Sequence, residues 1–442
     1  MTDGVRSPDA SPAAAGVDAE PQDGPRRDPA AGDGEAPRRE PEGGARDRPD
    51  WRPGTENNAA EWPQFRGPGR NGRVAWLPEA LPGEGDRLWT AALPSDGFGG
   101  VCVAGGLAVV GSRDAADVAD VWTAHNLATG EPRWTFRRPR PLTLDCGNSP
   151  RATPAYADGL LVVMGAGGSV HALDAEAGLA LWSAELTERF AVEAGEWGFG
   201  GSPLVVGERV IVSVGGGVRM AALDLLTGET VWASEGPGLP HASPVAVERG
   251  DRTLLAGVGG EGVYLLDAAD GSLAWEHRPD YFEEFGVPSA VRLPGGLLFA
   301  GENTGVRRFG LDDPSGPAAV NEFVTPDAHT PVLAGGVVLA AFEGLKGLDP
   351  ATLEERWAVA AGDVRSYASV IASEDRTLVT TEAGVQLLVA FDGASARVLD
   401  RREVASVKTL SHPAVAGGRL VTRVGRELRC ERLRSVRGRD GG

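Results

Sequence analysis

The chain has 442 residues, of which 42% are hydrophobic, so it can bury one large core or several smaller ones. Its 62 acidic residues outnumber its 43 basic residues and give a net charge of −19, which argues against nucleic acid as a partner. No apolar run is long enough for a membrane-spanning helix, so we expect no transmembrane segment. Cys102, Cys146 and Cys430 are isolated and give neither a disulfide framework nor a zinc site.

The first 60 residues differ in composition from the rest of the chain. They are rich in Pro, Gly, Ala, Arg and acidic residues, and they cannot bury enough apolar surface to offset the entropy of ordering. We therefore predict a disordered acidic tail over residues 1–60. Residues 1–30 lack the basic start and the apolar core of a signal peptide. We expect a cytoplasmic protein, or an extracytoplasmic one if the true start or the export route is not represented here.

A single strand is predicted around Trp89, in residues 86–94, with no hairpin partner next to it in the sequence. Eight strand entries follow, near residues 100, 153, 202, 243, 287, 330, 369 and 412. Several carry Ser-Pro or Thr-Pro, and each leads into two short apolar runs joined by a turn that usually contains Gly. Apolar runs of this length, bounded by turn residues, indicate strands that pair as hairpins.

A repeated sequence motif follows seven of these hairpins. It consists of an apolar strand, an Asp or Asn, a short turn and another strand. The Asx side chain is expected to accept hydrogen bonds from the turn, and Gly to supply the positive φ that the turn requires. Five copies carry Trp eight positions after the Asx residue, where it can cover the edge of a sheet. The Asx residues are Asn126, Asp174, Asp224, Asp267, Asp312, Asp349 and Asp392, and the Trp residues are Trp134, Trp182, Trp232, Trp275 and Trp357.

The copies of this motif start roughly 37 to 50 residues apart, a spacing typical of a four-stranded propeller blade. The eighth hairpin has no fourth strand after it, and the strand around Trp89 can supply one. The sequence therefore predicts an all-β, eight-bladed β-propeller of four-stranded antiparallel blades over residues 61–433, closed by this N-terminal strand. Residues 434–442 are predicted to be a flexible C-terminus, and the protein to be a monomer.

The loops that enter the blades are the candidate site, because strand entries of a propeller converge at one mouth of the central channel. We single out His241, His329, His412, Arg151, Tyr367, Trp197, Glu196 and Lys408. One interpretation is a small-molecule site in which histidines act as ligands or proton carriers. The alternative is that these side chains are polar because they face water. The spacing of the histidines and carboxylates gives no metal motif, so no metal is predicted.

The repeats from Ala172 to Trp182 and from Ala222 to Trp232 resemble those of the pyrroloquinoline-quinone (PQQ)-type β-propellers. The segment Trp62-Pro-Gln-Phe-Arg-Gly-Pro-Gly-Arg-Asn-Gly72 is similar to the opening motif of many bacterial proteins of that superfamily. The resemblance implies a propeller fold. It leaves two activities open, because the superfamily includes quinone-dependent alcohol dehydrogenases and also cofactor-free scaffolds such as the lipoprotein subunit of the outer-membrane β-barrel assembly machinery.

The dehydrogenases of this superfamily resemble one another in a pair of adjacent cysteines, a catalytic Asp and calcium ligands. This chain has no adjacent cysteines, and no calcium ligands can be placed in it. We therefore predict no cofactor, and neither PQQ nor calcium. The favoured function is a non-catalytic scaffold that binds a protein or peptide. The alternative is an enzyme or small-ligand-binding protein that uses the polar residues at the channel mouth.

Overall fold

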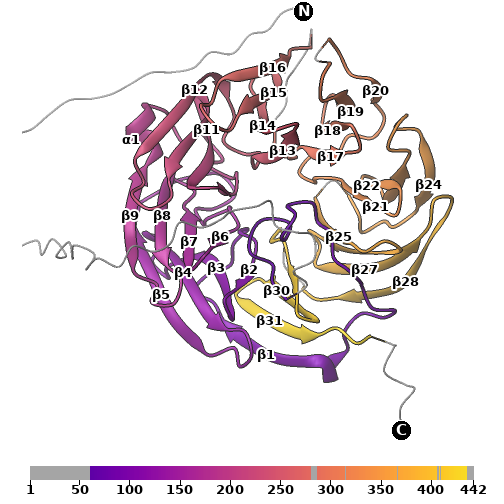
Figure 1. Cartoon of the computed structure of the whole chain (residues 1–442). Helices are drawn as coiled ribbons and strands as arrows, with labels where there is room; N and C mark the ends of the chain where they lie inside the picture. The colour runs from indigo at the N-terminus through magenta and orange to yellow at the C-terminus, as the bar shows by residue number, and fades with distance from the viewer. Residues whose placement is uncertain are drawn as a thin grey trace, which may run out of the picture. The chain divides into compact units, whose positions relative to one another are not determined.

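The computed structural model describes residues 60–279, 286–313, 315–365, 367–405, 408 and 410–435, all within one compact unit, Arg48–Gly442. The predictions of a disordered tail and of a flexible C-terminus fall almost wholly outside these residues and stay predictions. The described strands form eight antiparallel sheets arranged as the blades of a closed ring (Figure 1). The predicted eight-bladed propeller is confirmed.

The blades follow the chain in order. Blade 1 consists of β2 (Cys102–Ala104), β3 (Leu107–Arg113), β4 (Ala119–Asn126) and β5 (Pro132–Pro139). Blade 2 consists of β6 (Ala155–Ala157), β7 (Leu160–Met164), β8 (Ser169–Asp174) and β9 (Ala180–Glu185). Blade 3 consists of β10 (Leu204–Val206), β11 (Arg209–Asp224) and β12 (Thr230–Gly238). Blade 4 consists of β13 (Val245–Arg249), β14 (Arg252–Gly259), β15 (Gly262–Asp267) and β16 (Leu273–His277).

Blade 5 consists of β17 (Val291–Leu293), β18 (Gly296–Gly301), β19 (Gly305–Gly310) and β20 (Ala319–Asn321). Blade 6 consists of β21 (Val332–Ala334), β22 (Val337–Ala341), β23 (Leu345–Leu348) and β24 (Glu355–Val359). Blade 7 consists of β25 (Ala368–Ala372), β26 (Arg376–Thr381), β27 (Val385–Phe391) and β28 (Ala396–Glu403). Blade 8 consists of β29 (Ala414–Ala416), β30 (Arg419–Val424), β31 (Glu427–Arg432) and β1 (Arg87–Ala92). A short helix, α1 (Leu186–Phe190), follows β9, and a 3-10 turn, η1 (Glu84–Asp86), precedes β1.

Blade 3 has three strands because β11 takes both middle positions. It runs through Gly215 and Gly216, which have φ values of 106° and 56° at the point where the other blades turn between their second and third strands. β10 pairs with its first residues and β12 with its later ones, so the blade has the same layout as its neighbours.

The two ends of the repeat region meet in blade 8. β1 pairs antiparallel with β31, so that Trp89 lies opposite Cys430 and Ala92 opposite Glu427. Figure 1 shows the purple β1 alongside the yellow β31. The predicted closure by an N-terminal strand is thus confirmed.

The Asx residues of the repeat shape the turns that lead to the outermost strands. Asn126 and Asp174 each accept two turn N–H groups at 2.9–3.1 Å through one side-chain oxygen, and Asp224, Asp349 and Asp392 do the same. Asp267 accepts one such bond, from Ala269. Asp312 departs from the pattern, because its carboxylate pairs with Arg249 and its neighbour Asp313 accepts the turn bond from Ser315.

Each outer Trp reaches across to the turn of the following blade. The indole N–H groups of Trp89, Trp134, Trp182, Trp232 and Trp357 donate to the carbonyls of Leu127, Ala175, Leu225, Ala268 and Asp392 at 2.9–3.2 Å. Four of these rings also lie on the turn glycine: a Cβ at Gly130, Gly178, Gly228 or Gly271 would stand 2.4–2.6 Å from the ring. These glycines therefore satisfy two constraints, a positive φ and close contact with an indole.

Trp275 is the exception among the repeat tryptophans. Its buried N–H has no partner, and it faces blade 5, where the turn is the altered one at Asp312. Its ring packs against Phe309 instead, with the ring centroids 5.7 Å apart. The loss of the Asx turn in blade 5 thus removes the acceptor that the Trp of blade 4 would use.

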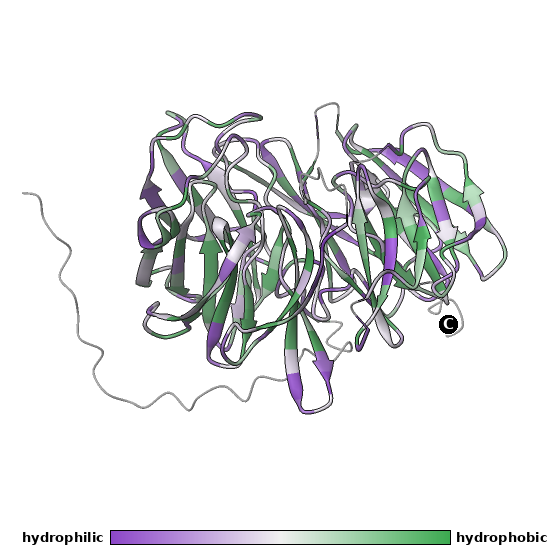
Figure 2. Ribbon diagram, turned by 90° about the horizontal axis from the view of Figure 1, so that it is seen from above, coloured by the Kyte–Doolittle hydropathy of each residue, from purple (hydrophilic) through white to green (hydrophobic). Residues whose placement is uncertain are grey.

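The inner strands of the blades carry the hydrophobic core. β7, β22 and β25 are buried along their whole length, whereas outermost strands such as β5 alternate between half-buried and exposed side chains. Hydrophobic colour runs along many strands of the ring in Figure 2. Burial of apolar faces between neighbouring blades supplies the main stabilisation.

Residues 62–74, which we call the plug, cross the centre of the ring (indigo in Figure 1). Trp62 pairs with Val103 in β2, and Gly72 and Val74 exchange hydrogen bonds with Ala372 in β25. Arg70 donates to the carbonyls of Ser202, Pro203 and Pro244 at 2.7–2.9 Å.

The rest of the plug contacts other blades. Arg66 donates to the carbonyl of Pro331 at 2.6 Å, and the ring of Phe65 lies 5.0 Å from that of His412. The motif that precedes the repeats therefore closes the central channel.

Replacement of Trp89 by Ala tests the closure. We expect a loss of about 3–5 kcal/mol in the free energy of unfolding, because the change removes a buried indole from the joint between blades 8 and 1. Trp76→Ala is the matched control, because Trp76 is 37% exposed, and we expect a loss of less than about 1 kcal/mol. Urea unfolding followed by circular dichroism measures both, and equal losses would contradict the closure.

Candidate binding cup on the propeller axis

Above the plug lies a cavity of about 350 Å³, which we call the cup. Phe65 of the plug lines it, and the ring of His412 meets that of Phe65 edge to face. The remaining walls come mainly from the segments that enter the eight blades. Its lining residues are Phe65, Phe98, Cys146, Arg151, Thr153, Trp197, Gly200, Ser202, His241, Ser243, Val287, Asp327, Ala328, Thr330, Tyr367, Ala368, Ser369, Thr380, Lys408, Leu410, Ser411 and His412.

The structure brings six of the eight candidate residues together. Arg151, Trp197, His241, Tyr367, Lys408 and His412 all line the cup. The ring centroids of Trp197 and His241 are 6.2 Å apart, although the two residues come from the loops of neighbouring blades. Side chains remote in the sequence therefore surround one concave, partly apolar space.

His329 and Glu196 do not line the cup. His329 is fully buried, with its Nδ1 atom 3.3 Å from the carbonyl oxygen of Ala368 and its Nε2 atom without a partner. Glu196 is exposed, and its backbone carbonyl accepts a hydrogen bond from Asp145. A residue's place in an entry loop thus did not determine the direction of its side chain, and these two candidates lie outside the lining of the cup.

Three aromatic rings of the cup each face a cation. Arg70 lies 5.8 Å from the centroid of Phe65, Arg151 lies 5.9 Å from Phe98, and Lys408 lies 5.4 Å from Tyr367. Each distance falls within the range of cation–π attraction. These contacts fix the orientation of the rings and place positive charge at the cup wall.

A belt of hydroxyl groups surrounds the lower part of the cup. The N–H groups of Thr153, Ser202, Ser243 and Ser289 donate to the hydroxyls of Ser202, Ser243, Ser289 and Thr330, each in the next blade, at 2.9–3.0 Å. Ser369 lines the cup as well, and its buried hydroxyl has no partner. Ser-Pro and Thr-Pro dipeptides marked these strand entries in the sequence, but they did not reveal that the hydroxyls join one blade to the next.

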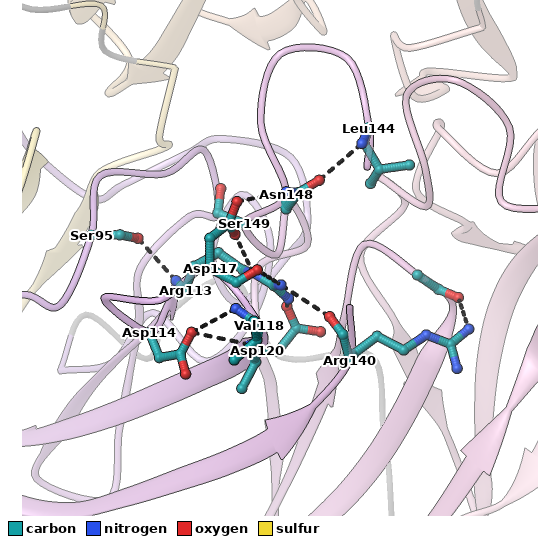
Figure 3. A network of polar contacts seen from close by, with 12 residues as sticks. Ser95, Arg113, Asp114, Asp117, Val118, Asp120, Arg140, Leu144, Asn148 and Ser149 are labelled. Carbon is teal, nitrogen blue, oxygen red and sulfur yellow. Dashed lines mark hydrogen bonds and ion pairs between the residues drawn. The ribbon is translucent and has the colours of Figure 1, made fainter. Parts of the chain in front are cut away.

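The loop that carries Cys146 and Arg151 is held by a polar network centred on Arg113 (Figure 3). The guanidinium of Arg113 donates to Asp117, to Asp120 and to the carbonyl of Arg140 at 2.7–2.9 Å. Burial raises the pKa of Asp120 to about 6 despite the bond from Arg113.

The other end of the loop is tied by Asn148, which donates to Asp117 at 2.7 Å and accepts a bond from the N–H of Leu144. Arg151 itself donates to the carbonyls of Asp145, Gly147 and Ser149. The guanidinium is therefore held in place by backbone oxygens.

The electrostatics favour uncharged histidines in the cup. Burial, followed by the charge of Arg151, lowers the pKa of His241 to about 4, and burial with the charge of Arg66 does the same for His412. Burial and the nearby Asp327 raise the pKa of Tyr367 to about 12. At neutral pH the cup thus offers neutral rings and hydroxyls that can exchange hydrogen bonds with a bound molecule.

The lining does not fit a calcium-assisted quinone. Calcium takes six to eight oxygen ligands, and the described lining provides one carboxylate, Asp327, which is bonded to Tyr367. Among the described residues, no group of three or more His, Cys, Asp or Glu side chains could hold a metal ion. The cysteines are separate, with Cys102 and Cys430 buried and Cys146 exposed. Nor does any helix of the described residues have the length and apolarity to span a membrane.

The fold and the repeats define an eight-bladed propeller of the PQQ-type repeat class. Residues 80–189 and 117–306 match the family model described as "Outer membrane protein assembly factor BamB", and the chain belongs to this family. An outer membrane protein assembly factor BamB from Burkholderia pseudomallei is 28% identical over 275 residues, which are 60% of this chain and 67% of that protein.

Solved structures share the fold at low sequence identity. BamB from Moraxella catarrhalis has a TM-score of 0.58 and 16% identity, covering 78% of this chain and 99% of that chain. Quinohemoprotein alcohol dehydrogenase from Comamonas testosteroni has a TM-score of 0.66 and 15% identity, covering 85% of this chain and 81% of that chain. A europium-containing methanol dehydrogenase has a TM-score of 0.66 and 13% identity, covering 84% and 91%. These likenesses show the fold and carry no activity to this chain.

His329 gives a pH prediction. Burial, followed by the charge of Arg66, lowers its pKa from 6.5 to about 3. The unfolded chain therefore takes up the proton first, so the stability conferred by neutral His329 is present above about pH 6.5 and is lost as the pH falls toward 3.

We expect His329→Gln to reduce the acid-side slope of the free energy of unfolding by on the order of 1 kcal/mol per pH unit. Denaturant unfolding between pH 4 and pH 7 measures the slope, with the half-buried His277 changed to Gln as the control. An unchanged slope in His329→Gln would contradict the assignment.

Proposed function

We propose that the protein is a non-catalytic scaffold that holds another protein on the outer wall of the propeller. The observation that carries the proposal is an unusual concentration of exposed hydrophobic side chains on four consecutive blades. Family membership supports it, because the matching family model is described as an outer membrane protein assembly factor.

The apolar rim, as we call it, consists of seven of the ten large hydrophobic side chains that are exposed among the described residues. All seven lie in the outermost strands of blades 2 to 5 or in the segments flanking those strands. Phe323 is 88% exposed and Leu179 68%, and the other five are between 38% and 49% exposed. The members are Leu179, Leu181, Leu226, Val231, Leu273, Val320 and Phe323.

The rim follows the joints between blades. Trp182 of blade 2 bonds to Leu225 of blade 3, and Leu226 is the next residue. Trp232 of blade 3 bonds to Ala268 of blade 4, whose turn leads to Leu273. Because Trp182 and Trp232 tie their outer strands to the next turns, the rim residues of blades 2 to 4 stand on a rigid wall. Exposed apolar patches on a rigid surface are typical of protein interaction sites.

The same comparison bears on the compartment. An outer membrane assembly factor works outside the cytoplasm, so we assign this chain to an extracytoplasmic compartment by analogy with the BamB proteins. This replaces the cytoplasmic expectation drawn from the composition of residues 1–30. The export route and the monomeric state stay predictions.

A double substitution on the rim tests the scaffold. The tagged protein is expressed in its own organism, cross-linked in the cell envelope and purified, and the captured proteins are identified by mass spectrometry. We expect Val231→Glu with Leu273→Glu to reduce recovery of the main captured protein at least tenfold, because the charges must be desolvated at the interface.

Val398→Glu is the matched control, because Val398 is 40% exposed on blade 7, away from the rim. We expect it to leave recovery within twofold of the wild type. Thermal midpoints within a few degrees of each other would show that all variants are folded. Full recovery with the rim double variant would contradict the proposal.

A second function, binding of a small molecule in the cup, is favoured by the convergence of six candidate residues on one cavity of about 350 Å³. The walls combine rings such as Trp197 and Phe98 with hydroxyls and cations. A partly apolar pocket with a few convergent polar groups is the usual form of a ligand site.

Native mass spectrometry tests this second function on protein purified from its own organism. We expect an added mass that is lost in the double variant Tyr367→Ala with His241→Ala and retained in Val398→Glu. Wild-type protein that carries no added mass and gains no thermal stability from a panel of small organic acids, amines and sugars would contradict it.

A further inference from the structure

The outer edge of β9 has unpaired backbone groups from Ala180 to Ala184. β9 is the outermost strand of blade 2, and it pairs with β8 in unbroken register from Trp182 to Glu185. Among the described residues, no hydrogen bond other than those to β8 involves the backbone of residues 180–184, whereas Glu185 is the N-cap of α1. In an antiparallel pair, alternate residues direct their N–H and C=O groups away from the partner strand, so this edge presents free donors and acceptors.

This edge lacks the residues that commonly protect outer strands. Ala180 to Ala184 contain neither a charge nor a proline, whereas charges and prolines interrupt the edges of several other blades. β5 has Pro132, Arg133 and Arg137, and β24 has Glu355 and Arg356. The absence of such protection leaves β9 able to pair with another strand.

Two other outer strands share an uncharged run but differ in geometry. β12 has two register shifts beyond the one at its start, so it offers a short regular edge. β1 exposes no large hydrophobic side chain. β9 has a regular edge from Trp182 to Glu185, and the exposed leucines Leu179 and Leu181 lie just before it, at the register shift where the strand begins.

The charges at the ends of β9 indicate the composition of its partner. Glu176 lies in the turn just before the strand, and Glu188 lies in α1 just after it. Both are exposed, and neither forms an ion pair among the described residues. Glu185, the last residue of β9, is already bound by Arg138 and Arg140. An apolar centre flanked by unpaired carboxylates is complementary to an apolar segment with basic ends.

We propose that β9 binds an extended segment of the partner protein by strand addition, and that this segment alternates apolar residues and ends in Lys or Arg. Main-chain hydrogen bonds to the free edge would provide the affinity, and Leu181 with the flanking carboxylates would select the sequence. This inference rests on the proposed scaffold function and specifies how the rim holds its partner.

A peptide titration tests the proposal with the full chain. The probe is a fluorescein-labelled peptide, Lys-Val-Thr-Val-Thr-Val-Lys, and its affinity is measured by fluorescence anisotropy. A matched probe carries N-methyl groups at alternate residues, which removes the donors of one edge and keeps the side chains. We expect the N-methylated peptide to bind at least tenfold more weakly.

Two variants locate the binding edge. Leu181→Lys places a charge on β9 and is expected to weaken binding at least tenfold. Val398→Lys is the matched control on β28, because Leu181 and Val398 are 49% and 40% exposed and Val398 lies outside the apolar rim, and it is expected to change binding less than twofold. Glu176→Gln with Glu188→Gln is expected to weaken binding and to flatten its dependence on salt.

Three results would overturn the proposal: no binding up to 1 mM peptide, equal binding of the N-methylated peptide, or a larger loss with Val398→Lys than with Leu181→Lys. The capture experiment separates this failure from failure of the scaffold function, because its rim variant leaves β9 unchanged. If the partner protein is still captured and the rim variant still reduces its capture, but the peptide does not bind, then strand addition alone is overturned.

Discussion

The ring depends on one repeated contact, the bond from an outer Trp of one blade to the turn of the next. An Asx side chain shapes the turn, a glycine leaves room for the indole, and the indole N–H satisfies a turn carbonyl. Because Trp89 makes this contact from the N-terminal strand, the joint between blades 8 and 1 matches those between blades 1 and 2, 2 and 3, 3 and 4, and 6 and 7. The contact also fixes the outer strands in space, which gives the apolar rim a rigid support.

The centre of the ring is set by a different kind of contact. Arg66 and Arg70 are buried, and burial lowers the pKa of each to about 9, yet Arg70 donates to uncharged acceptors, three backbone carbonyls and the side-chain oxygen of Gln64. The plug thus uses guanidinium groups to satisfy strand-entry carbonyls that converge on the axis. It turns an open channel into a cup with a closed lower end. The axis and the outer wall are therefore separate surfaces, and each can bind without the other.

The fold was predictable because its signal is local and repeated. Asp174, Gly178 and Trp182 recur at fixed spacing, and each has a local physical role. The cup was predictable in part, since strand entries of a propeller converge and Arg151, His241 and His412 follow from that topology. His329 could not be placed, because the direction of a loop side chain depends on neighbours such as Ala368 that lie far away in the sequence. The bonds from Arg70 reach residues more than a hundred positions away, so no repeat in the sequence marks them. The change in blade 5 was also hidden, because the turn bond expected at Asp312 is made by the adjacent Asp313.

Hydrogen exchange of the tryptophan indole N–H groups, followed by NMR, tests the ring closure most directly. The closed ring predicts that the Trp89 indole exchanges as slowly as those of Trp134 and Trp182, because all three donate to a turn carbonyl of the next blade. Trp76, which is 37% exposed, sets the rate for an accessible indole. Exchange of Trp89 at the rate of Trp76 would contradict the closure.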